Sequence, residues 1–513
     1  MLSAFGGLTP LQILGGVSPL FISIIVAYFA VVVGIGYWGY ITTDTEEDFL
    51  VAGREIGPVV GAATLSATQL SAGTFVGLMG VHYLTGVSWA YIWPPLWLGW
   101  IISLIWIAPH MRRFGELTVP DFVAARYADD GNGGQYMRAL AAVLITLVYT
   151  VYITGQYVAS GLIFKSMFGI PEVWGMVFFV VIVILYTSIG GMRSSMLSDF
   201  LQLIIMGVGA VVAVPLVLNF AGGFGEVEAL LASVNPKFVG FYYTPIEVAT
   251  FGAAFMFSMA AAPYELVRIY SMRDEQTVRT AIGLTLIFQV IIGASLAFVS
   301  MGTRVLFPEL GNPDLTSVIL SINVLGPVLG ALVISAVLSA MLSTIDSIMI
   351  VSASGLAHDL YVEIFNPDAS DRKRLWANRI AVGIVGLIPL LLAQFQDLLG
   401  GLVQFIIVLQ ASMMGAMMFI PVILGLHWRK GNTVAAAVGM VAGVLAVLAW
   451  FGAKQMNIIS GGILVQIDGI IPGVLVNFIL FFLLSYFEVG GEPSSQSLHR
   501  FFDVEAPSSS SDD

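Results

Sequence analysis

Cysteine is absent from this sequence, so neither disulfide bonds nor thiolate metal sites contribute to its structure or chemistry. Charge is scarce as well: Asp, Glu, Lys and Arg make up 10% of the 513 residues, whereas soluble domains carry roughly 25%. No basic residue precedes Arg54. Because a cleavable signal peptide begins with a positively charged region, we expect none here and assign residues 1–18 to a short extracellular segment.

Apolar residues are correspondingly abundant. They make up 58% of the chain, the mean hydropathy is +0.93, and many runs reach the roughly 20 residues that a helix needs to cross a bilayer. Backbone groups in lipid must be paired within their own segment, so these runs are predicted to be helices. The alternation of apolar and polar residues typical of a membrane β-barrel is not found. The sequence therefore predicts an all-α polytopic protein of the plasma membrane.

The remaining charge is mostly acidic, with a net charge of -12. The segment 488–513 is acidic and rich in serine, a composition typical of disorder, and we expect a disordered cytoplasmic tail there. Acidic surfaces keep a protein hydrated and soluble, which favours a halophilic source. An ordinary acidic tail is the alternative interpretation.

Apolar runs separated by polar breaks predict thirteen membrane spans. Lys and Arg concentrate on the cytoplasmic side of membrane proteins, so they indicate the orientation. With the N-terminus outside, inner loops hold all but four of the 20 basic residues, Arg268 included; the exceptions are Lys165, Lys237, Arg304 and Lys454. We therefore predict an outer N-terminus and an inner C-terminus. The spans are centred near residues 19–41, 57–80, 87–108, 137–166, 171–189, 197–220, 248–267, 280–303, 327–358, 379–396, 398–428, 432–452 and 469–487.

Two of these spans, five apart in order, are expected to be interrupted. The second reads GAATLSATQLSAGTFVGLMG, with small and hydroxyl residues where a lipid-facing helix has Leu and Ile. The seventh contains Pro263, which removes one helical hydrogen bond and clashes with the preceding turn. Secondary transporters built from inverted repeats bind their solutes and ions at such interruptions. Tight helix packing through small residues is the alternative.

The ninth span carries an unusual polar face. Ser339, Ser343, Asp346 and Ser347 share one side of the helix at 3.6 residues per turn. Hydroxyl and carboxylate oxygens suit alkali and alkaline-earth cations rather than zinc or copper, and a carboxylate inside a membrane is costly unless it is paired or functional. Asp346 is therefore a candidate cation ligand; a helix–helix hydrogen bond from a protonated Asp346 is the alternative.

Four segments together resemble the sodium/solute symporter family along nearly the whole chain. They read DFLVAGREIGPVVGAATLSATQLSAGTF, TVPDFVAARY, YTSIGGMRSSMLSDFLQ and SAMLSTIDSIMIVSASGLAHDLY. NPDL near Asp314, the Pro263 region and ILGLHWRKGNTVAAAVGM are most similar to the sodium/pantothenate and related monocarboxylate branch. The resemblance implies a leucine-transporter-type core of two inverted five-helix repeats. These would be 57–220 and 248–428, preceded by an extra helix at 19–41 and followed by two helices at 432–487.

The resemblance also implies sodium ligands. The family's principal sodium site corresponds to the carbonyls of Ala67, Leu70 and Ala340 and the hydroxyls of Ser343 and Thr344. Some members hold a second sodium ion near the aspartate that corresponds to Asp199, with Ser343, Asp346 and Ser347 facing it. Position 346 is more often a small polar residue in the family. The extra carboxylate here either strengthens a second cation site, which we favour because two ionised aspartates need a positive partner, or titrates and couples protons.

The solute is expected between the two interrupted spans. Relatives that carry proline have an acid where this chain has Gln69, which favours a solute contact over ion coordination for that side chain. The lysine that sugar carriers use in the eighth span is missing, and we expect no Arg or Lys deep in the core. Pantothenate or another monocarboxylate is favoured, with an amino acid such as proline as the alternative. The candidate contacts are Gln69, Ser71, Thr74, Tyr149, Tyr152, Gln156, Tyr264 and Gln410.

Other functions fit the sequence poorly. The glycine pattern in GIGYWG lies mid-helix rather than at a strand-to-helix turn, so it does not indicate a dinucleotide site. The five histidines are scattered without metal-binding spacing, and no nucleophile–base pair indicates an enzyme. A channel or a transporter-like sensor is a weaker reading. We predict a sodium-coupled transporter working by alternating access, with a small organic solute and the bilayer as partners, no nucleic acid and no assigned oligomeric state.

Overall fold

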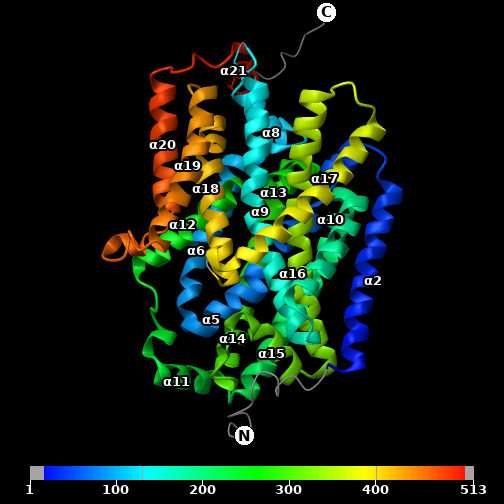
Figure 1. Ribbon diagram of the computed structural model, residues 1–513, viewed down its shortest axis with the longest axis vertical. Helices are drawn as coiled ribbons and strands as arrows, with labels where there is room; N and C mark the ends of the chain where they lie inside the picture. Colours follow the sequence, from blue (N-terminus) through cyan, green and yellow to red (C-terminus); the bar gives the residue numbers. More distant parts are fainter. Residues whose placement is uncertain (1–16, 130, 400, 503–513) are drawn as a thin grey trace, which may run out of the picture.

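The computed structural model describes residues 17–129, 131–399 and 401–502, and in these residues it is a bundle of helices (Figure 1). The described backbone has one isolated bridge, between Ile56 and Met272, and no strand. Most long helices run along the long axis of the molecule in Figure 1, and α2 begins at the end opposite the one that carries α21. The α-helices are α2 (Pro19–Thr42), α3 (Glu46–Val51), α4 (Pro58–Gln69), α5 (Met79–Thr85), α6 (Trp93–Ile102), α7 (Ala108–Phe114), α8 (Val119–Arg126), α9 (Gly133–Phe168), α10 (Glu172–Phe220), α11 (Phe224–Val234), α12 (Pro245–Ala261), α13 (Pro263–Ser271), α14 (Glu275–Leu306), α15 (Thr316–Asn323), α16 (Gly326–Ser354), α17 (Asp371–Leu392), α18 (Val403–His427), α19 (Thr433–Gln455), α20 (Ile470–Tyr486) and α21 (Ser495–Phe502).

Ten helical segments in the described residues are long and apolar enough to cross a membrane, and α20 is a shorter apolar helix. Counting helices by length and apolar composition therefore does not give the predicted thirteen spans. One reason is that this count treats α10 as a single span. Phe178 packs against Phe29 of α2 at 6.4 Å between ring centroids. Gln202 donates to the hydroxyl of the neighbouring Tyr28 at 3.3 Å. In a straight helix these two residues of α10 would lie about 36 Å apart, so α10 doubles back on itself.

The reversal occurs at Gly191, which has φ 61° and ψ -163°. Residues with a side chain rarely adopt such a positive φ. A Cβ at this position would also lie 2.6 Å from the ring of Phe49. Glycine is therefore required both by the backbone conformation and by the close approach of α3, and the two arms of α10 match the separate fifth and sixth spans that the sequence predicts.

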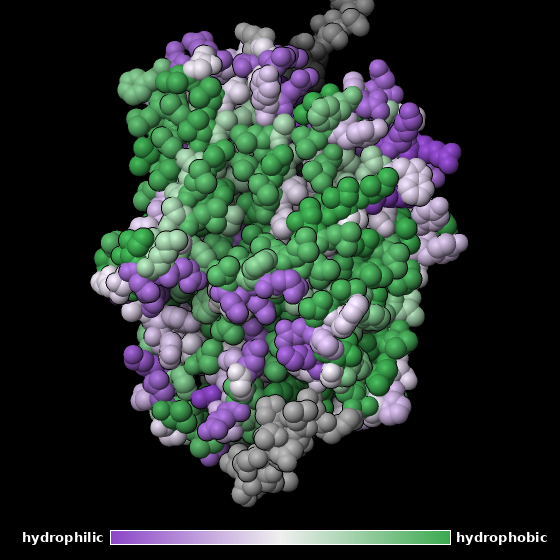
Figure 2. Space-filling view, in the orientation of Figure 1, coloured by the Kyte–Doolittle hydropathy of each residue, from purple (hydrophilic) through white to green (hydrophobic). Residues whose placement is uncertain are grey.

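The surface of the bundle is largely apolar. Figure 2 shows hydrophobic residues over most of this face, with hydrophilic residues gathered at the end that carries α21 and in a band across the lower half. Exposed side chains include Leu387 and Leu391 of α17 and Leu475 of α20. On a soluble protein, a hydrophobic surface that covers most of one face would be a binding surface or a cause of aggregation. Here it fits contact with lipid.

Helices α16 and α18 form the centre of the molecule. In the most apolar window, 94% of the α18 residues are buried, and 83% in the segment formed by α16 and its continuation to Phe365; in α2 the figure is 28%. Helix α16 is thus surrounded by protein on all sides, which allows its polar face to bond to neighbouring helices instead of facing lipid.

Both predicted helix interruptions are present. Helix α4 ends at Gln69, and the next residue, Leu70, is extended with φ -76° and ψ 94°. Helix α12 ends at Ala261, and Ala262 has φ -65° and ψ 122° before α13 begins at Pro263. A residue that precedes proline is pushed out of the helical region by the proline ring, so Pro263 explains the second interruption directly.

The prediction of a disordered tail from residue 488 onward is wrong for part of that segment. Residues 495–502 form α21, whose Phe501 stacks on Phe114 at 4.8 Å and meets Phe122 edge-on at 5.6 Å. Ser497 donates to the carbonyl of Arg126 at 2.6 Å. The serine-rich composition predicted disorder, but one aromatic residue in the segment, Phe501, packs on α7 and α8. Residues 503–513, and most of the predicted N-terminal segment, lie outside the described residues.

A buried polar network lies at the end that carries α21. His358 faces Glu46 at 3.3 Å through Nδ1 and Asp121 at 3.4 Å through Nε2. Arg138 pairs with Asp121 and, at 3.3 Å, with Asp359. Burial raises the pKa of Asp121, but the hydrogen bond and charge of His358 outweigh it and lower this pKa to about 2. Asp121, His358 and Asp359 lie close enough together to hold a metal ion, which the scattered spacing of the histidines in the sequence did not predict. Arg138 already supplies a positive charge to these carboxylates.

Candidate ion and solute site

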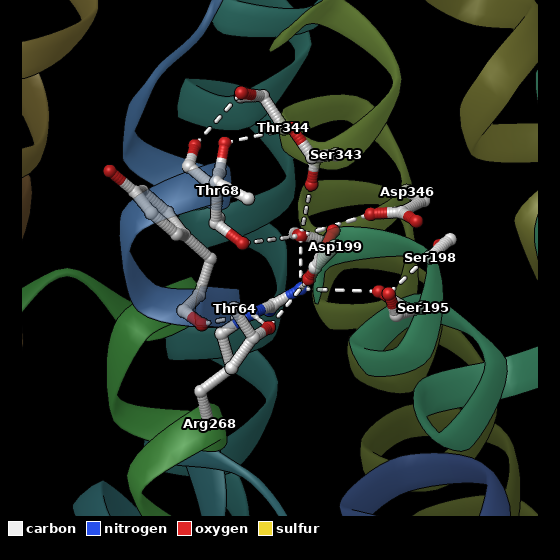
Figure 3. Close-up of polar contacts among 12 residues, drawn as sticks. Thr64, Thr68, Ser195, Ser198, Asp199, Arg268, Ser343, Thr344 and Asp346 are labelled. Carbon is white, nitrogen blue, oxygen red and sulfur yellow. Dashed lines mark hydrogen bonds and ion pairs between the residues drawn. The ribbon is translucent and has the colours of Figure 1, made fainter. Parts of the chain in front are cut away.

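The interrupted helix α4 meets the polar face of α16 through two hydroxyl groups (Figure 3). Ser343 Oγ donates to the carbonyl of Ala67 at 2.7 Å, and Thr344 Oγ1 donates to the carbonyl of Thr68 at 2.8 Å. Both hydroxyls also lie near the carbonyl of Ala340, at 3.3 Å and 2.9 Å. Because α4 stops at Gln69, the carbonyls of its last turn have no helical partner and are free to accept these bonds.

Four of the five predicted ligands of the principal sodium site therefore converge. They are Ala67, Ala340, Ser343 and Thr344. In the described residues no hydrogen bond joins Leu70 to α16, and the carbonyl of Thr68 is engaged instead. The cluster contains only oxygen donors, two of them hydroxyls that can turn from a carbonyl toward an ion. This donor set fits a hard cation such as sodium.

A second cluster lies beside the first, around a buried arginine. The prediction that no Arg or Lys lies deep in the core is wrong: Arg268 of α13 has no exposed surface. Its Nη2 lies 3.2 Å from Asp199 Oδ2, and its Nε donates to Thr64 at 2.8 Å (Figure 3). Further donors go to Ser195 at 3.2 Å and to Ser347. A fully buried guanidinium is stable only when it is paired in this way.

Asp346 belongs to the same cluster but has its own donors. The hydroxyl of Tyr186 donates to Asp346 Oδ2 at 2.5 Å, and Ser347 donates to Oδ1 at 3.0 Å. Asp199 receives a hydrogen bond from Thr64 at 2.5 Å. The predicted ligands Asp199, Ser347 and Asp346 of the second cation site are thus linked: Arg268 bonds to Asp199 and Ser347, and Ser347 bonds to Asp346. Ser343 joins them through its carbonyl, which accepts from Ser347, while its hydroxyl belongs to the first cluster. Arg268 is the positive partner that two ionised aspartates need.

Sequence reasoning missed Arg268 because it was assigned to an inner loop. The helix that follows the interruption at Ala262 has only nine residues, and Arg268 is one of them. Arg268 lies four residues after Tyr264, and its Nη1 donates to the carbonyl of Tyr264 at 3.2 Å. The run PYELVRIY places it between apolar residues, a pattern that indicates burial.

A cavity lies next to the interruption of α4. Six of the eight predicted solute contacts line it, and they are Gln69, Ser71, Thr74, Tyr152, Tyr264 and Gln410. Sequence reasoning missed several lining residues, among them Trp89, Trp93, Phe255 and Gln404. The three aromatic side chains are common in apolar spans, so nothing in their local sequence separates them from packing residues. Gln404 is an amide in the same apolar helix as Gln410, and that signal could have identified it. No charged side chain lines the cavity in the described residues.

The other two predicted contacts, Tyr149 and Gln156, do not line the cavity but bond to the backbone beside the two interruptions. Gln156 Oε1 accepts a hydrogen bond from the backbone N–H of Ala72 at 2.9 Å, which satisfies a donor exposed by the interruption. The hydroxyl of Tyr149 accepts from the backbone N–H of Tyr264 at 3.0 Å, just after the second interruption. Both side chains come from α9, so this helix holds the two interrupted helices in place.

Three tyrosines pack together beside the cavity, and two of them, Tyr152 and Tyr264, line it. The ring of Tyr264 lies 5.7 Å from that of Tyr149 and 6.3 Å from that of Tyr152. Its hydroxyl donates to Gln69 Oε1 at 3.0 Å. Tyr264 thus joins the second interrupted helix to the end of α4, and its carbonyl is bonded to Arg268, so it lies between the cavity and the charged cluster.

Comparison with known proteins gives a consistent family. The model of the sodium:solute symporter family matches residues 49–443. The sodium/proline symporter 2 of Staphylococcus saprophyticus is 30% identical over 484 residues, which cover 90% of this chain and 91% of that protein. The high-affinity proline transporter of Bacillus subtilis is 28% identical over 434 residues, covering 82% of this chain and 89% of that protein.

Solved structures give the same fold. A sodium-coupled sialic acid symporter in a substrate-bound, outward-open state superposes with a TM-score of 0.76 at 16% identity, covering 92% of this chain and 98% of that one. A nucleobase-cation-symport-1 family transporter with a bound hydantoin superposes with a TM-score of 0.55 at 15% identity, covering 88% of this chain and 97% of that one. At these identities the likeness concerns the fold.

Proposed function

Because this chain belongs to the sodium:solute symporter family, we propose that it carries proline, or a zwitterion of similar size and shape, together with sodium ions. The chain is a multi-pass transporter of the plasma membrane and, like its relatives, not an enzyme. Sodium is its co-transported ion. The proposal concerns the solute and the residues that hold it and the ions.

The charge-free lining of the cavity is the observation that carries this proposal. Gln69, Gln404 and Gln410 offer amide groups, and Ser71 and Thr74 offer hydroxyls. A zwitterion has no net charge, so neutral polar groups and local dipoles suffice to bind it. The aromatic faces of Trp89 and Trp93 suit both an apolar ring and, through the cation–π interaction, an ammonium group. The curated relatives reported above, which are named as proline carriers, favour the same solute.

The carboxylate of the solute would lie at the interruption of α4. Backbone N–H groups after the break belong to the start of the following helical segment, where the helix dipole favours negative charge. A sodium ion at Ala67, Ala340, Ser343 and Thr344 would replace the hydrogen bonds that now join α4 to α16. Ion and solute would then stabilise the same arrangement of α4, and this shared preference is a coupling free energy between the two sites.

A monocarboxylate such as pantothenate is the competing solute. A net negative charge in this cavity would have no cationic side chain to meet among the described lining residues, and it would depend on the co-bound sodium alone. At position 69, this chain has Gln where proline-carrying relatives have an acid. The site therefore carries one negative charge fewer, and a monocarboxylate would meet less repulsion there.

The test uses purified protein in liposomes with an inward sodium gradient. We expect labelled proline to accumulate with sodium and not with choline, and we expect unlabelled proline, but not pantothenate, acetate or lactate, to compete. Gln69→Ala should weaken proline uptake, whereas Gln289→Ala, a buried glutamine of α14 that does not line the cavity, should leave it unchanged. Sodium-driven accumulation of pantothenate or lactate without proline uptake would instead establish the monocarboxylate reading.

A further inference from the structure

Glu265 is a buried acid that the proposed transport site does not use. It lies on α13 directly after Tyr264, with 1% of its surface exposed. Neither of its carboxyl oxygens has a hydrogen-bond partner in the described part of the chain. It does not line the solute cavity, so the solute is not the missing partner. An ionised carboxylate inside a membrane span without donors is highly unfavourable, and Glu265 therefore holds a proton in this conformation.

The nearest cation is engaged elsewhere. Arg268 lies three residues further along α13, a spacing at which side chains on one helix can meet. Yet its guanidinium makes no hydrogen bond to Glu265. Its donors go instead to Thr64, Ser195, Asp199, Ser347 and the carbonyl of Tyr264.

Three acids thus share one arginine. Asp199, Asp346 and Glu265 all interact electrostatically with Arg268. Asp199 and Asp346 have hydrogen-bond donors of their own, from Thr64 and Tyr186. One guanidinium balances one carboxylate, so the cluster needs further positive charge, and a sodium ion and a proton are the two cations that fit.

We propose that Glu265 is a proton site linked to sodium binding through Arg268. When a sodium ion enters between Asp199 and Asp346, it replaces the guanidinium as their counter-charge. Arg268 is then free to pair with Glu265 on the same helix. The O–H bond of the Glu265 carboxyl breaks, the proton passes to solvent water, and the carboxylate forms an ion pair. One positive charge enters the cluster and one leaves it.

The surroundings of Glu265 leave Arg268 as the group that controls this proton. The other titratable groups acting on it are Tyr149 and Tyr152 of α9, Tyr264 and, from α10, Asp199. Helix α13 also packs on α3, α7 and α8. Their charged groups are engaged elsewhere. Glu46 and Asp121 belong to the His358 network, and Arg112 and Arg126 donate to backbone carbonyls. The remaining pairs are Glu47 with Arg54, Asp48 with Arg193 and Arg113 with Glu275, and the ring of His110 packs against His427.

This inference rests on the proposed second cation site but not on the identity of the solute, so its test uses none. Sodium chloride is added to weakly buffered full-length protein in lipid nanodiscs, with choline chloride as the salt control. A pH-indicator dye reports protons, and tryptophan fluorescence reports sodium binding. Because cation binding at a protonated site releases protons, we expect the wild-type protein to release about one proton per chain.

Glu265→Gln keeps the shape of the side chain and removes the proton, and it should show the sodium-induced fluorescence change with no proton release. Glu265→Asp should restore release. Glu228→Gln, on the exposed surface of α11, should behave as the wild type. Undiminished release in Glu265→Gln, or a wild-type protein that binds sodium without releasing protons, would overturn the proposal. Absence of both signals in the wild type would overturn it together with the second cation site, while sodium-driven proline uptake would be judged separately.

Discussion

Two neighbouring hydroxyl groups connect the interrupted helix to the centre of the molecule. Ser343 and Thr344 bond to the carbonyls of Ala67 and Thr68, and they are the α16 groups that we propose to bind the principal sodium ion. The hydroxyl-rich face of this helix was predictable from its 3.6-residue periodicity. The engagement of Thr68 was not, because the local geometry of an interrupted helix decides which carbonyls point outward.

The double substitution Ser343→Ala and Thr344→Ala should weaken the apparent affinity for sodium. Each lost oxygen ligand is worth on the order of 1 kcal/mol, so we expect a loss of roughly 10-fold to 100-fold. The measurement is solute uptake as a function of sodium concentration. Ser352→Ala, which removes another buried hydroxyl of α16 without a hydrogen-bond partner, is the matched control. An unchanged sodium dependence in the double variant would remove these residues from the site.

Asp314, outside the membrane spans, gives a prediction about pH. Burial raises its pKa to about 6 from the ordinary 3.8, although the backbone N–H of Val403 donates to its Oδ2 at 3.1 Å. The folded protein therefore holds a proton here that the unfolded chain loses between about pH 4 and pH 6. Across that window, stability should fall as pH rises, by about 3 kcal/mol in total.

Asp314→Asn should remove this slope, because the amide does not titrate while its oxygen still accepts from Val403. Thermal unfolding followed between pH 4 and pH 7 tests it, with the exposed Asp397→Asn as control. If Asp314→Asn kept the slope of the wild type, the buried carboxyl would not be its cause.

Interruptions in two helices create the site, and they differ in how far their residues reveal them. The break before Pro263 follows from the chemistry of proline and was predictable. The reversal of α10 at Gly191 was expected from the polar residues around it, although α10 registers as one long helix by composition. An interruption in the span around Gln69 was expected from its small and hydroxyl residues, but its position depends on a partner from another helix, and no local sequence pattern predicts that Gln156 accepts the N–H of Ala72.

Gln156→Leu should therefore loosen the interruption of α4. Leucine fills a similar volume but cannot accept a hydrogen bond, and a buried N–H left without a partner costs about 1–3 kcal/mol. We expect a lower thermal midpoint together with weaker apparent affinity for both sodium and solute. Ser160→Ala, whose hydroxyl bonds only within α9, serves as control. Stability lost without any change in affinity would show that Gln156 supports the helix and not the site.

At the scale of the whole molecule, composition was enough to predict a helical membrane protein, and motifs were enough to predict its family. The family match and the solved structures bear out both. Composition misled at the C-terminus, since α21 depends on one phenylalanine docking on a distant surface. It also misplaced Arg268, since burial of a charge depends on partners from several helices that are far apart in the sequence.

Deletion of residues 495–513 should destabilise the protein. It exposes the surface of α7 and α8 that Phe501 covers and removes the ion pair between Arg500 and Glu116. Burial of one aromatic side chain is worth roughly 1.5–3 kcal/mol, so we expect a clear drop in thermal midpoint, reproduced in part by Phe501→Ala. Deletion of residues 503–513 alone is the control. Equal midpoints for both deletions would mean that α21 does not contribute to stability.

The guanidinium of Arg268 touches α4, α10 and α16 from its position on α13. Any rearrangement that separates these helices must break several charge-assisted hydrogen bonds before new ones form. Such a step has a large activation enthalpy, whereas sodium binding at Ala67, Ala340, Ser343 and Thr344 leaves the bonds of Arg268 in place. Cooling should therefore slow turnover much more steeply than it changes the affinity for sodium, and at low temperature the transporter would become a loaded carrier that rarely completes its cycle.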